Sequence, residues 1–368
     1  MQKFVLARIV AMNGIDIGLF DYDRHNALYF FILNADEQIY LRYGGRDAED
    51  AMTYLNLESL ELALRAGLDR HELYKQGKLA KQPRPAPFYP EQITLLKRNE
   101  IDRGRCVECH MIGDYLAQEA EQAGKLDRPR MLYPSPDLKT IGIHLDVPKG
   151  LVIEKAEGAA AKAGMQSGDK ITEIGGANVL TFGDLQYRYG KTDRNAQRIE
   201  LTIDRAGKRK SLSVELPADW WLTDTGYRFW SVEPMLYFAT RPLTAEQKRR
   251  LNLPVSGFAS EVVEPADSPA QFKKLPMAGR VAKIGKVLEV DQQAQLEKLP
   301  MLKPGDIITG VEGVQESRLT QDVERYIKLT KKAGDTITLD LLRDGKPTQI
   351  KQNSYRLFYR KSNPSRNK

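Results

Sequence analysis

Residues 141–179 read IGIHLDVPKGLVIEKAEGAAAKAGMQSGDKITEIGGANV, and this stretch decides the fold. Its apolar run at residues 151–154 is typical of a short strand, and the alanine-rich residues 159–163 are typical of a short helix. Gly164 ends that helix, because glycine adopts the left-handed cap conformation without a Cβ clash. Gly168 and Asp169 then predict a tight turn into a second strand at residues 170–174.

The same pattern occurs a second time, as PGDII at residues 304–308 followed by Gly313. A helix is expected after each copy, at residues 182–189 and 322–329. The strand and turn that follow also correspond, since LTIDRAGK at 201–208 matches LDLLRDGK at 339–346. Two copies at one offset predict a tandem repeat of one structural unit.

Each copy resembles a PDZ domain of the bacterial HtrA type. The resemblance implies two small β-barrels capped by helices, at residues 141–216 and 246–352, which bind the C-termini of proteins or peptides by adding them to a sheet edge. In the first copy it implies a binding loop, the start of an edge strand, and two helix residues one turn apart that face the groove. These residues are Ile141, Gly142 and Ile143 in the loop, His144 and Leu145 in the strand, and Leu185 and Tyr189 in the helix. A groove filled by a neighbouring part of the same chain is the alternative.

The second copy is less regular than the first. Its binding loop is expected at residues 253–258, where Pro254 removes a backbone amide. A Lys-rich insertion at residues 272–302 precedes its Gly-Asp turn. The connector at residues 217–245 holds all three tryptophans, Trp220, Trp221 and Trp230, which are expected to pack the two copies together.

The first 75 residues predict a small α+β unit. Residues 4–10 form an apolar, β-branched run typical of a strand, and residues 27–33 and 38–43 predict a hairpin around a turn at Asn34. Residues 57–71 have leucines at roughly helical spacing. A strand, a connection, a hairpin and a final helix is the order of the second half of a thioredoxin-like fold.

Four further sequence motifs lie in this unit and in the segment that follows it: NGIDIGLFDYD at 13–23, NADEQIYLRYGGR at 34–46, CVECH at 106–110 and YPSPD at 133–137. Together with the repeats they resemble the bacterial thioredoxin-7/PDZ family, some of whose members are selenoproteins. Met1 stands just before what would be the second strand of the thioredoxin-like domain. The resemblance therefore implies that residues 1–75 are the C-terminal half of that domain. It also implies that the first half, with its redox pair and any signal peptide, is missing from a protein that works in the periplasm or elsewhere outside the cytoplasm.

Both cysteines lie in one motif, Cys106-Val107-Glu108-Cys109-His110, within a segment at 76–140 that begins as a proline-rich linker and is expected to form a helix at 91–101. The spacing C-x-x-C-H is that of c-type haem attachment, in which two thiols bind the vinyl groups and the histidine binds the iron. His110 would then be the axial ligand, with Met131 as the candidate for the sixth position. The alternatives are a redox-active dithiol, with Cys106 and Cys109 as the reacting pair, or a static disulfide; zinc is disfavoured because no second Cys/His pair stands at finger spacing.

The composition, with 41% hydrophobic and 29% charged residues, is that of a folded protein. The net charge of +7 does not indicate nucleic acid, because residues 1–75 hold 8 basic against 12 acidic side chains and a basic tail at 353–368 supplies much of the excess. The sequence contains no apolar run long enough for a transmembrane helix and no serine-protease nucleophile motif.

The sequence thus predicts an α+β multidomain protein, in which a partial thioredoxin-like unit precedes two PDZ-type barrels. The function expected is a redox-linked adaptor that binds peptide C-termini and carries a haem c or dithiol centre; its peptide and redox partner are not specified by the sequence. A thiol–disulfide oxidoreductase or peroxidase-like enzyme with its active site in the missing half is an alternative, as is a purely structural interaction protein.

Overall fold

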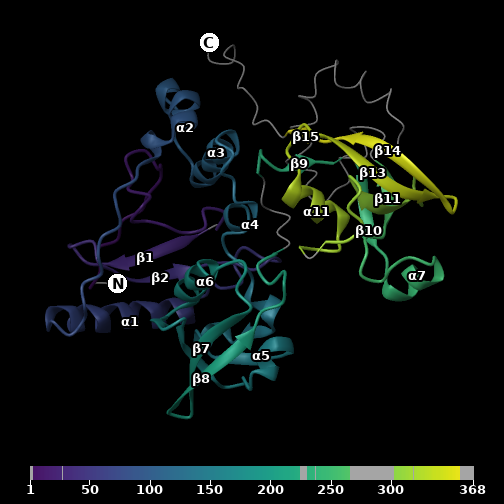
Figure 1. Cartoon of the computed structure of the whole chain (residues 1–368). Helices are drawn as coiled ribbons and strands as arrows, with labels where there is room; N and C mark the ends of the chain where they lie inside the picture. The colour runs from purple at the N-terminus through teal and green to yellow at the C-terminus, as the bar shows by residue number, and fades with distance from the viewer. Residues whose placement is uncertain are drawn as a thin grey trace. The chain divides into compact units, whose positions relative to one another are not determined.

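The computed structural model describes residues 3–26, 28–223, 230–236, 238–265, 302–317 and 319–356 (Figure 1). The chain divides into two compact units, Met1–Thr225 and Gly226–Lys368, and each is described by itself. The predicted insertion at 272–302, apart from Leu302, lies outside the described residues. So do the basic tail beyond residue 356 and residues 224–229 of the tryptophan-rich connector.

The first unit begins with the predicted hairpin and helix. Strands β1 (Tyr29–Leu33) and β2 (Ile39–Gly44) pair antiparallel around a turn in which Asn34 accepts backbone hydrogen bonds. Helix α1 (Leu57–Lys75) is capped by Asn56 and packs on this hairpin. Gly67 permits the close approach, since a Cβ there would lie 2.7 Å from Ile32. The predicted hairpin and helix are confirmed. Two strands and one helix are not enough to identify a thioredoxin-like domain, so that assignment stays a prediction.

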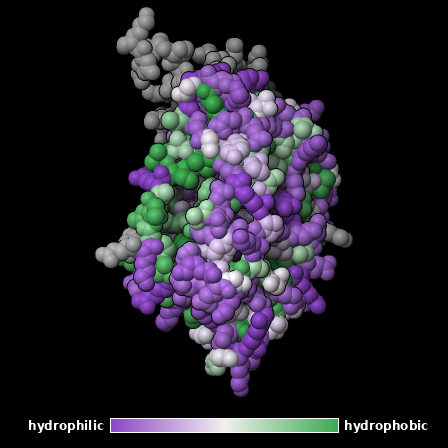
Figure 2. Space-filling model, turned by 90° about the vertical axis from the view of Figure 1, so that its left-hand side faces the viewer, coloured by the Kyte–Doolittle hydropathy of each residue, from purple (hydrophilic) through white to green (hydrophobic). Residues whose placement is uncertain are grey.

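The strand predicted at residues 4–10 is wrong. Residues 5–10 have no regular secondary structure, and Val5, Leu6, Ile9 and Val10 are exposed. In the described part of the chain no strand pairs with this segment, so its amides and carbonyls join no ladder. Figure 2 looks at the side where Figure 1 draws the N-terminal hairpin and shows apolar residues gathered on an otherwise hydrophilic face.

A helical segment follows the proline-rich stretch. Its elements are η1 (Pro90–Gln92), α2 (Thr94–Asn99), η2 (Ile101–Arg103), α3 (Cys109–Gln122) and α4 (Arg128–Met131). The helix expected at 91–101 is thus broken into short pieces. Helices α2 and α3 share an apolar core that includes Leu96, Val107 and Ile112, so the cysteine motif leads directly into a packed helix.

The first repeat forms two small sheets. In chain order its elements are η3 (Leu138–Ile141), β3 (Ile143–Leu145), η4 (Val147–Lys149), β4 (Ile153–Ala156), α5 (Gly158–Lys162), β5 (Lys170–Ile174), β6 (Ala177–Asn178), α6 (Phe182–Gly190), β7 (Arg198–Arg205) and β8 (Lys208–Glu215). Strand β3 pairs with β4, and the other sheet has the order β6-β5-β7-β8. The predicted strands, the alanine-rich helix and the helix after Val179 are all confirmed.

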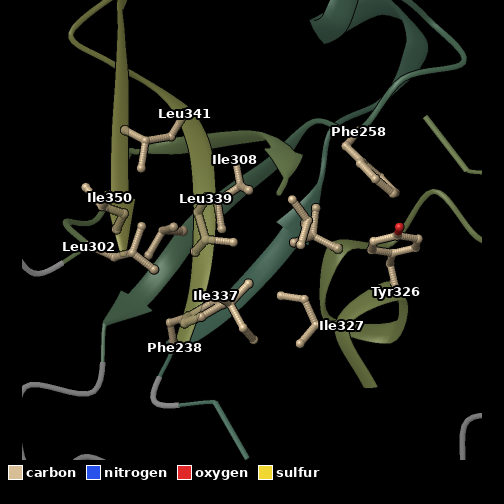
Figure 3. Close-up of a cluster of buried hydrophobic side chains, with 13 residues drawn as sticks. Phe238, Phe258, Leu302, Ile308, Tyr326, Ile327, Ile337, Leu339, Leu341 and Ile350 are labelled. Atoms are coloured by element: carbon tan, nitrogen blue, oxygen red, sulfur yellow. The ribbon is translucent and has the colours of Figure 1, made fainter. Parts of the chain in front are cut away.

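The second unit contains the second repeat. Its elements are β9 (Pro234–Met235), β10 (Phe238–Pro242), α7 (Ala245–Arg250), β11 (Ser260–Pro265), β12 (Ile307–Val311), α11 (Val323–Thr330), β13 (Thr336–Arg343), β14 (Lys346–Asn353) and β15 (Tyr355–Arg356). Five strands form one sheet in the order β10-β11-β12-β13-β14, and β9 pairs with β15. Figure 3 shows Tyr326 and Ile327 of α11 directed at the buried apolar face of this sheet.

One ion pair marks the same place in both repeats. Asp169, after the first Gly-Asp turn, accepts two hydrogen bonds from Arg205, at 2.6 and 2.7 Å. Asp306, after the second, accepts two from Arg343, at 2.8 and 2.7 Å. In each case a strand residue exchanges backbone bonds with the turn: Ile153 in β4 and Val262 in β11.

This correspondence aligns β11 with β4, and therefore β10 with β3. The binding loop of the second repeat must then precede Phe238, so its prediction at residues 253–258 is wrong. Residues 253–258 instead follow β10 and α7, where the second repeat has a longer connection than η4 provides in the first. The error arose because a Gly-Phe pair in that connection imitates the loop, and only the strand pairing distinguishes the two.

Candidate functional site

The backbone of the binding loop predicted for the first repeat adopts a conformation that requires glycine at position 142. Gly142 follows η3 with φ of +82°, and a Cβ there would lie 2.0 Å from the carbonyl oxygen of Glu157. The Glu157 N–H donates to the Gly142 carbonyl at 2.9 Å, which ties the loop to the end of β4. No residue other than glycine fits this position without moving the backbone.

The groove residues predicted for the first repeat are nearly all buried. Ile143, Leu185 and Tyr189 are fully buried, and Ile141, Gly142 and Leu145 are also buried. His144 alone is partly exposed, and its Nε2 lies 2.9 Å from a Glu157 carboxylate oxygen. Within the described residues β3 pairs only with β4, so its other edge has no strand partner.

Residues beyond β8 cover the loop end of this groove. The indole of Trp220 lies 4.7 Å from the Tyr189 ring, measured between centroids, and Thr140 Oγ1 donates to the Trp220 carbonyl at 2.8 Å. The Asp137 amide donates to Thr223 Oγ1, also at 2.8 Å. The chain that leaves the first repeat therefore packs beside the predicted binding loop, and a groove filled by this segment stays a prediction.

Trp220 and Trp221 thus both pack inside the first unit, Trp221 against Tyr133 with ring centroids 5.5 Å apart. That they hold the two repeats together, with Trp230, stays a prediction. Their local contacts are with the first repeat and the segment before it.

The N-terminal hairpin covers another side of α6, which the sequence did not indicate. The Arg42 amide of β2 donates to Asp184 Oδ1 at 2.9 Å, and Gln186 Nε2 donates to the Arg46 carbonyl at 2.8 Å. Burial raises the pKa of Asp184 to about 6, against the lowering effect of the Arg42 amide. Helix α6 is therefore held between the hairpin and its own sheet.

The second repeat has an edge strand with a different environment. Strand β10 ends the five-stranded sheet, and among the described residues no other strand pairs with its free side. On that side the Thr240 amide and hydroxyl both donate to Glu324 Oε1 of α11, at 2.5 and 3.0 Å. Burial raises the pKa of Glu324, although these two bonds act in the opposite direction. A half-buried carboxylate thus occupies the place where a peptide strand would pair.

The cysteine motif lies at the start of α3. Cys109 is the first residue of the helix and is half-buried, whereas Cys106 is exposed; both thiols are free. Val107 between them is buried, and its amide and carbonyl bond to Asn13 and Met12 at 3.0 Å each. The His110 ring lies 3.5 Å from the Glu108 carboxylate.

Tyr22 is a neighbour of this motif that the sequence did not suggest. Burial, and next the interaction with the Cys109 side chain, raise the pKa of Tyr22 above the ordinary value. Its ring stacks on Tyr29 at 4.8 Å and lies beneath the Arg24 guanidinium at 5.0 Å. Tyr22 also lines a polar cavity of about 140 Å³ together with residues of α6.

The motif does not fit a haem in this arrangement. A c-type haem needs both thiols and the adjacent histidine at an apolar crevice that can hold the macrocycle. Here the apolar residues of α3, among them Ile112, pack on α2, and a cavity of about 380 Å³ lies elsewhere, between α1 and the first repeat. Met131 is partly buried in α4. In the described ranges no three His, Cys, Asp or Glu side chains are grouped as metal ligands, and no helix is long and apolar enough to cross a membrane.

Comparison with known proteins agrees with the repeat. A family described as "PDZ domain" matches residues 140–216 and 269–352, so the chain contains PDZ domains. The second match begins after β10 and β11, and the assignment of these two strands to the second repeat rests on the strand pairing. A protein of Pseudomonas savastanoi pv. phaseolicola described as "Probable periplasmic serine endoprotease DegP-like" is 27% identical over 216 residues, which are 56% of this chain and 38% of that protein. A protein of the same description from Pseudomonas putida is 32% identical over 133 residues, or 34% of this chain and 27% of that protein.

The chain therefore spans less than two fifths of the length of these curated relatives. A solved structure described as "HtrA-type protease AlgWS227A with decapeptide" matches with 16% identity and a TM-score of 0.22, over 45% of this chain and 43% of that one. The two DegP-like relatives and the PDZ match support the HtrA-type resemblance that the sequence predicted.

Proposed function

We propose that this chain is an adaptor that binds the C-termini of other proteins, and that the second repeat is its principal recognition site. PDZ domains bind extended peptides by adding them as a strand to a sheet edge. The observation that carries the proposal is the free side of β10, which lies next to α11 at the edge of a five-stranded sheet. In the first repeat the corresponding groove residues are buried and Trp220 covers the loop end, which favours the second repeat as the more accessible site.

Location outside the cytoplasm is part of the proposal. It rests on the description of the two relatives as periplasmic. Fractionation of cells that express the protein from its own gene should place it in the periplasmic fraction.

The binding function is tested by fluorescence anisotropy on the full chain with a library of labelled peptides that end in apolar residues. Micromolar binding is expected, and each positive peptide is compared with the same peptide carrying a C-terminal carboxamide, which removes the terminal charge. A large loss of affinity with the carboxamide supports end recognition. Thr240→Pro removes one backbone donor of the edge strand and should also abolish binding. Absence of binding to any peptide, or equal binding of acids and amides, would contradict the proposal.

A redox dithiol at Cys106 and Cys109 is the second candidate function. It is favoured by the exposure of Cys106 and by the place of Cys109 at the first position of a 14-residue helix. In this reaction the Cys106 thiolate attacks a protein disulfide, and one sulfur of that disulfide leaves as a thiolate, which takes up a proton. Cys109, after losing its proton, then displaces the second sulfur, so the dithiol becomes a disulfide as the substrate is reduced to two thiols.

Thiol titration in glutathione buffers tests this candidate, with Cys106→Ser as the control. A reversible two-electron transition that disappears in the variant is expected. A pyridine haemochrome spectrum after co-expression with haem-maturation proteins tests the haem alternative, and we expect no haem signal. Cysteines that stay reduced at every potential would contradict the dithiol.

A further inference from the structure

We propose that Glu324 selects peptides that carry a lysine or arginine close to their C-terminus. This inference rests on the proposed function of the second repeat. It concerns the chemical class of the partner, a protein with a basic side chain near an apolar C-terminal residue. The argument starts from what a peptide would have to displace at β10.

A peptide strand that adds to β10 needs the outward-facing backbone donors of that strand. The Thr240 amide is such a donor, because it points to α11 and bonds to Glu324 Oε1 at 2.5 Å instead of bonding to β11. The Thr240 hydroxyl reinforces the contact at 3.0 Å. A peptide carbonyl that takes the Thr240 amide must therefore replace the Glu324 carboxylate.

The displaced carboxylate then needs a new partner. Glu324 is half-buried, and burial already raises its pKa, so its charged form is poorly solvated where it stands. Among the described residues it forms no ion pair; Lys328 favours its ionised form from the next turn, and Asp322 at the helix N-cap opposes it. A half-buried carboxylate that loses its donors costs free energy unless a charge or a new hydrogen bond compensates it. A basic side chain of the peptide provides both.

The first repeat shows what the same helix position does without a carboxylate. Glu324 is the second residue of α11, and the second residue of α6 is Gly183. A Cβ at Gly183 would lie 2.8 Å from the Arg42 carbonyl, because the hairpin packs there. At this helix position only the second repeat has a carboxylate beside its edge strand, since the hairpin leaves no room for a side chain in the first.

The experiment uses the full chain and matched peptides that share one apolar C-terminal residue. Lysine, alanine, serine or glutamate is placed in turn at each of the four preceding positions, and affinities are measured by anisotropy at neutral pH. At one position the lysine peptide should bind at least about tenfold more tightly than the glutamate peptide. This ratio corresponds to a difference of about 1.4 kcal/mol in binding free energy. Glu324→Gln should reduce that ratio to about one, and Glu324→Lys should invert it. Glu316→Gln, an exposed glutamate of the same repeat, should leave the ratio unchanged.

The outcomes separate this inference from the function on which it rests. If peptides bind but lysine is no better than alanine or serine at every position, the inference is wrong and the binding function stands. If Glu324→Gln retains the full preference, another residue selects the peptide and the inference is also wrong. If no peptide binds to the native protein, the proposed function itself fails.

Discussion

Asp169→Asn and Asp306→Asn should each destabilise one repeat and leave the other intact. Asp169 is almost fully buried and accepts two bonds from Arg205 and one from the Gln166 amide, at 2.8 Å. Asparagine has nearly the same volume and keeps one acceptor oxygen, but it loses the charge that makes the paired bonds strong. Since Arg205 is only partly buried, the loss should lie below the 3–5 kcal/mol of a fully buried broken pair, at about 2 to 3 kcal/mol.

For a unit of this size, about 2 to 3 kcal/mol corresponds to a fall in Tm of about 4 to 12 °C. Calorimetry of the full chain measures this fall, and hydrogen exchange by mass spectrometry locates it. Amides of the first repeat, such as that of Ile153, should exchange faster in Asp169→Asn, and that of Val262 should exchange faster in Asp306→Asn. Each variant is thus the control for the other.

The pH dependence of the effect follows from the sign of the pKa shifts. Burial opposes ionisation of both aspartates, but the bonds from Arg205 and Arg343 outweigh it and lower both pKa values. A lowered pKa contributes stability above the ordinary aspartate pKa, and this contribution is lost as the pH falls through the lowered value. The difference between native protein and variant should therefore be constant near neutral pH and shrink below about pH 4. A fall in Tm of less than 2 °C, or faster exchange in both repeats for either variant, would refute the reasoning.

Three further predictions concern the first unit. Burial raises the pKa of Asp184 to about 6, so lowering the pH from 7 to 5 should increase the free energy of unfolding of the native unit relative to that of Asp184→Asn, as measured by urea titration. A decrease of this difference over the same pH range would contradict the burial of Asp184. Gly190→Ala should destabilise the unit by about 2 kcal/mol or more, since the new Cβ would lie 2.2 Å from the Pro134 carbonyl; an unchanged midpoint of urea unfolding would show that the segment moves freely. Tyr22→Phe should change the rate at which iodoacetamide labels Cys109 in a Cys106→Ser background without affecting peptide affinity, because the Tyr22 hydroxyl interacts with the Cys109 side chain; an unchanged labelling rate would remove Tyr22 from the redox proposal.

Local rules explain which parts of the fold could be predicted. The Gly-Asp turns, the alanine-rich helix and the two helices after them depend on neighbours within a few residues, and these signals are strong. The hairpin at β1 and β2 was recognisable for the same reason, since Asn34 organises its turn through its own side chain. Residues 4–10 had the same strand character, but a strand exists only where a neighbour supplies its hydrogen bonds, and none does so in the described residues.

The candidate functional residues also divide into those that local sequence patterns indicate and those that only tertiary contacts bring together. Gly142 and the sequence around it predicted the first binding loop, while the contact between Tyr189 and Trp220 depends on a segment that returns from beyond β8. The CxxC spacing identified a thiol pair, but Tyr22, which touches Cys109, stands more than eighty residues earlier and carried no signal. The second loop was misplaced because spacing alone could not say which strand pairs with β11.

By itself the sequence determined that two similar units exist, because glycine at a positive φ followed by a buried aspartate is a local requirement of each turn. The tertiary structure alone decided which edge is available and what stands beside it. Thr240 and Glu324 are 84 residues apart, and the hydrogen bond between them forms only when α11 folds against β10. Contacts of this kind depend on how whole elements pack, and no pattern of neighbouring residues encodes them.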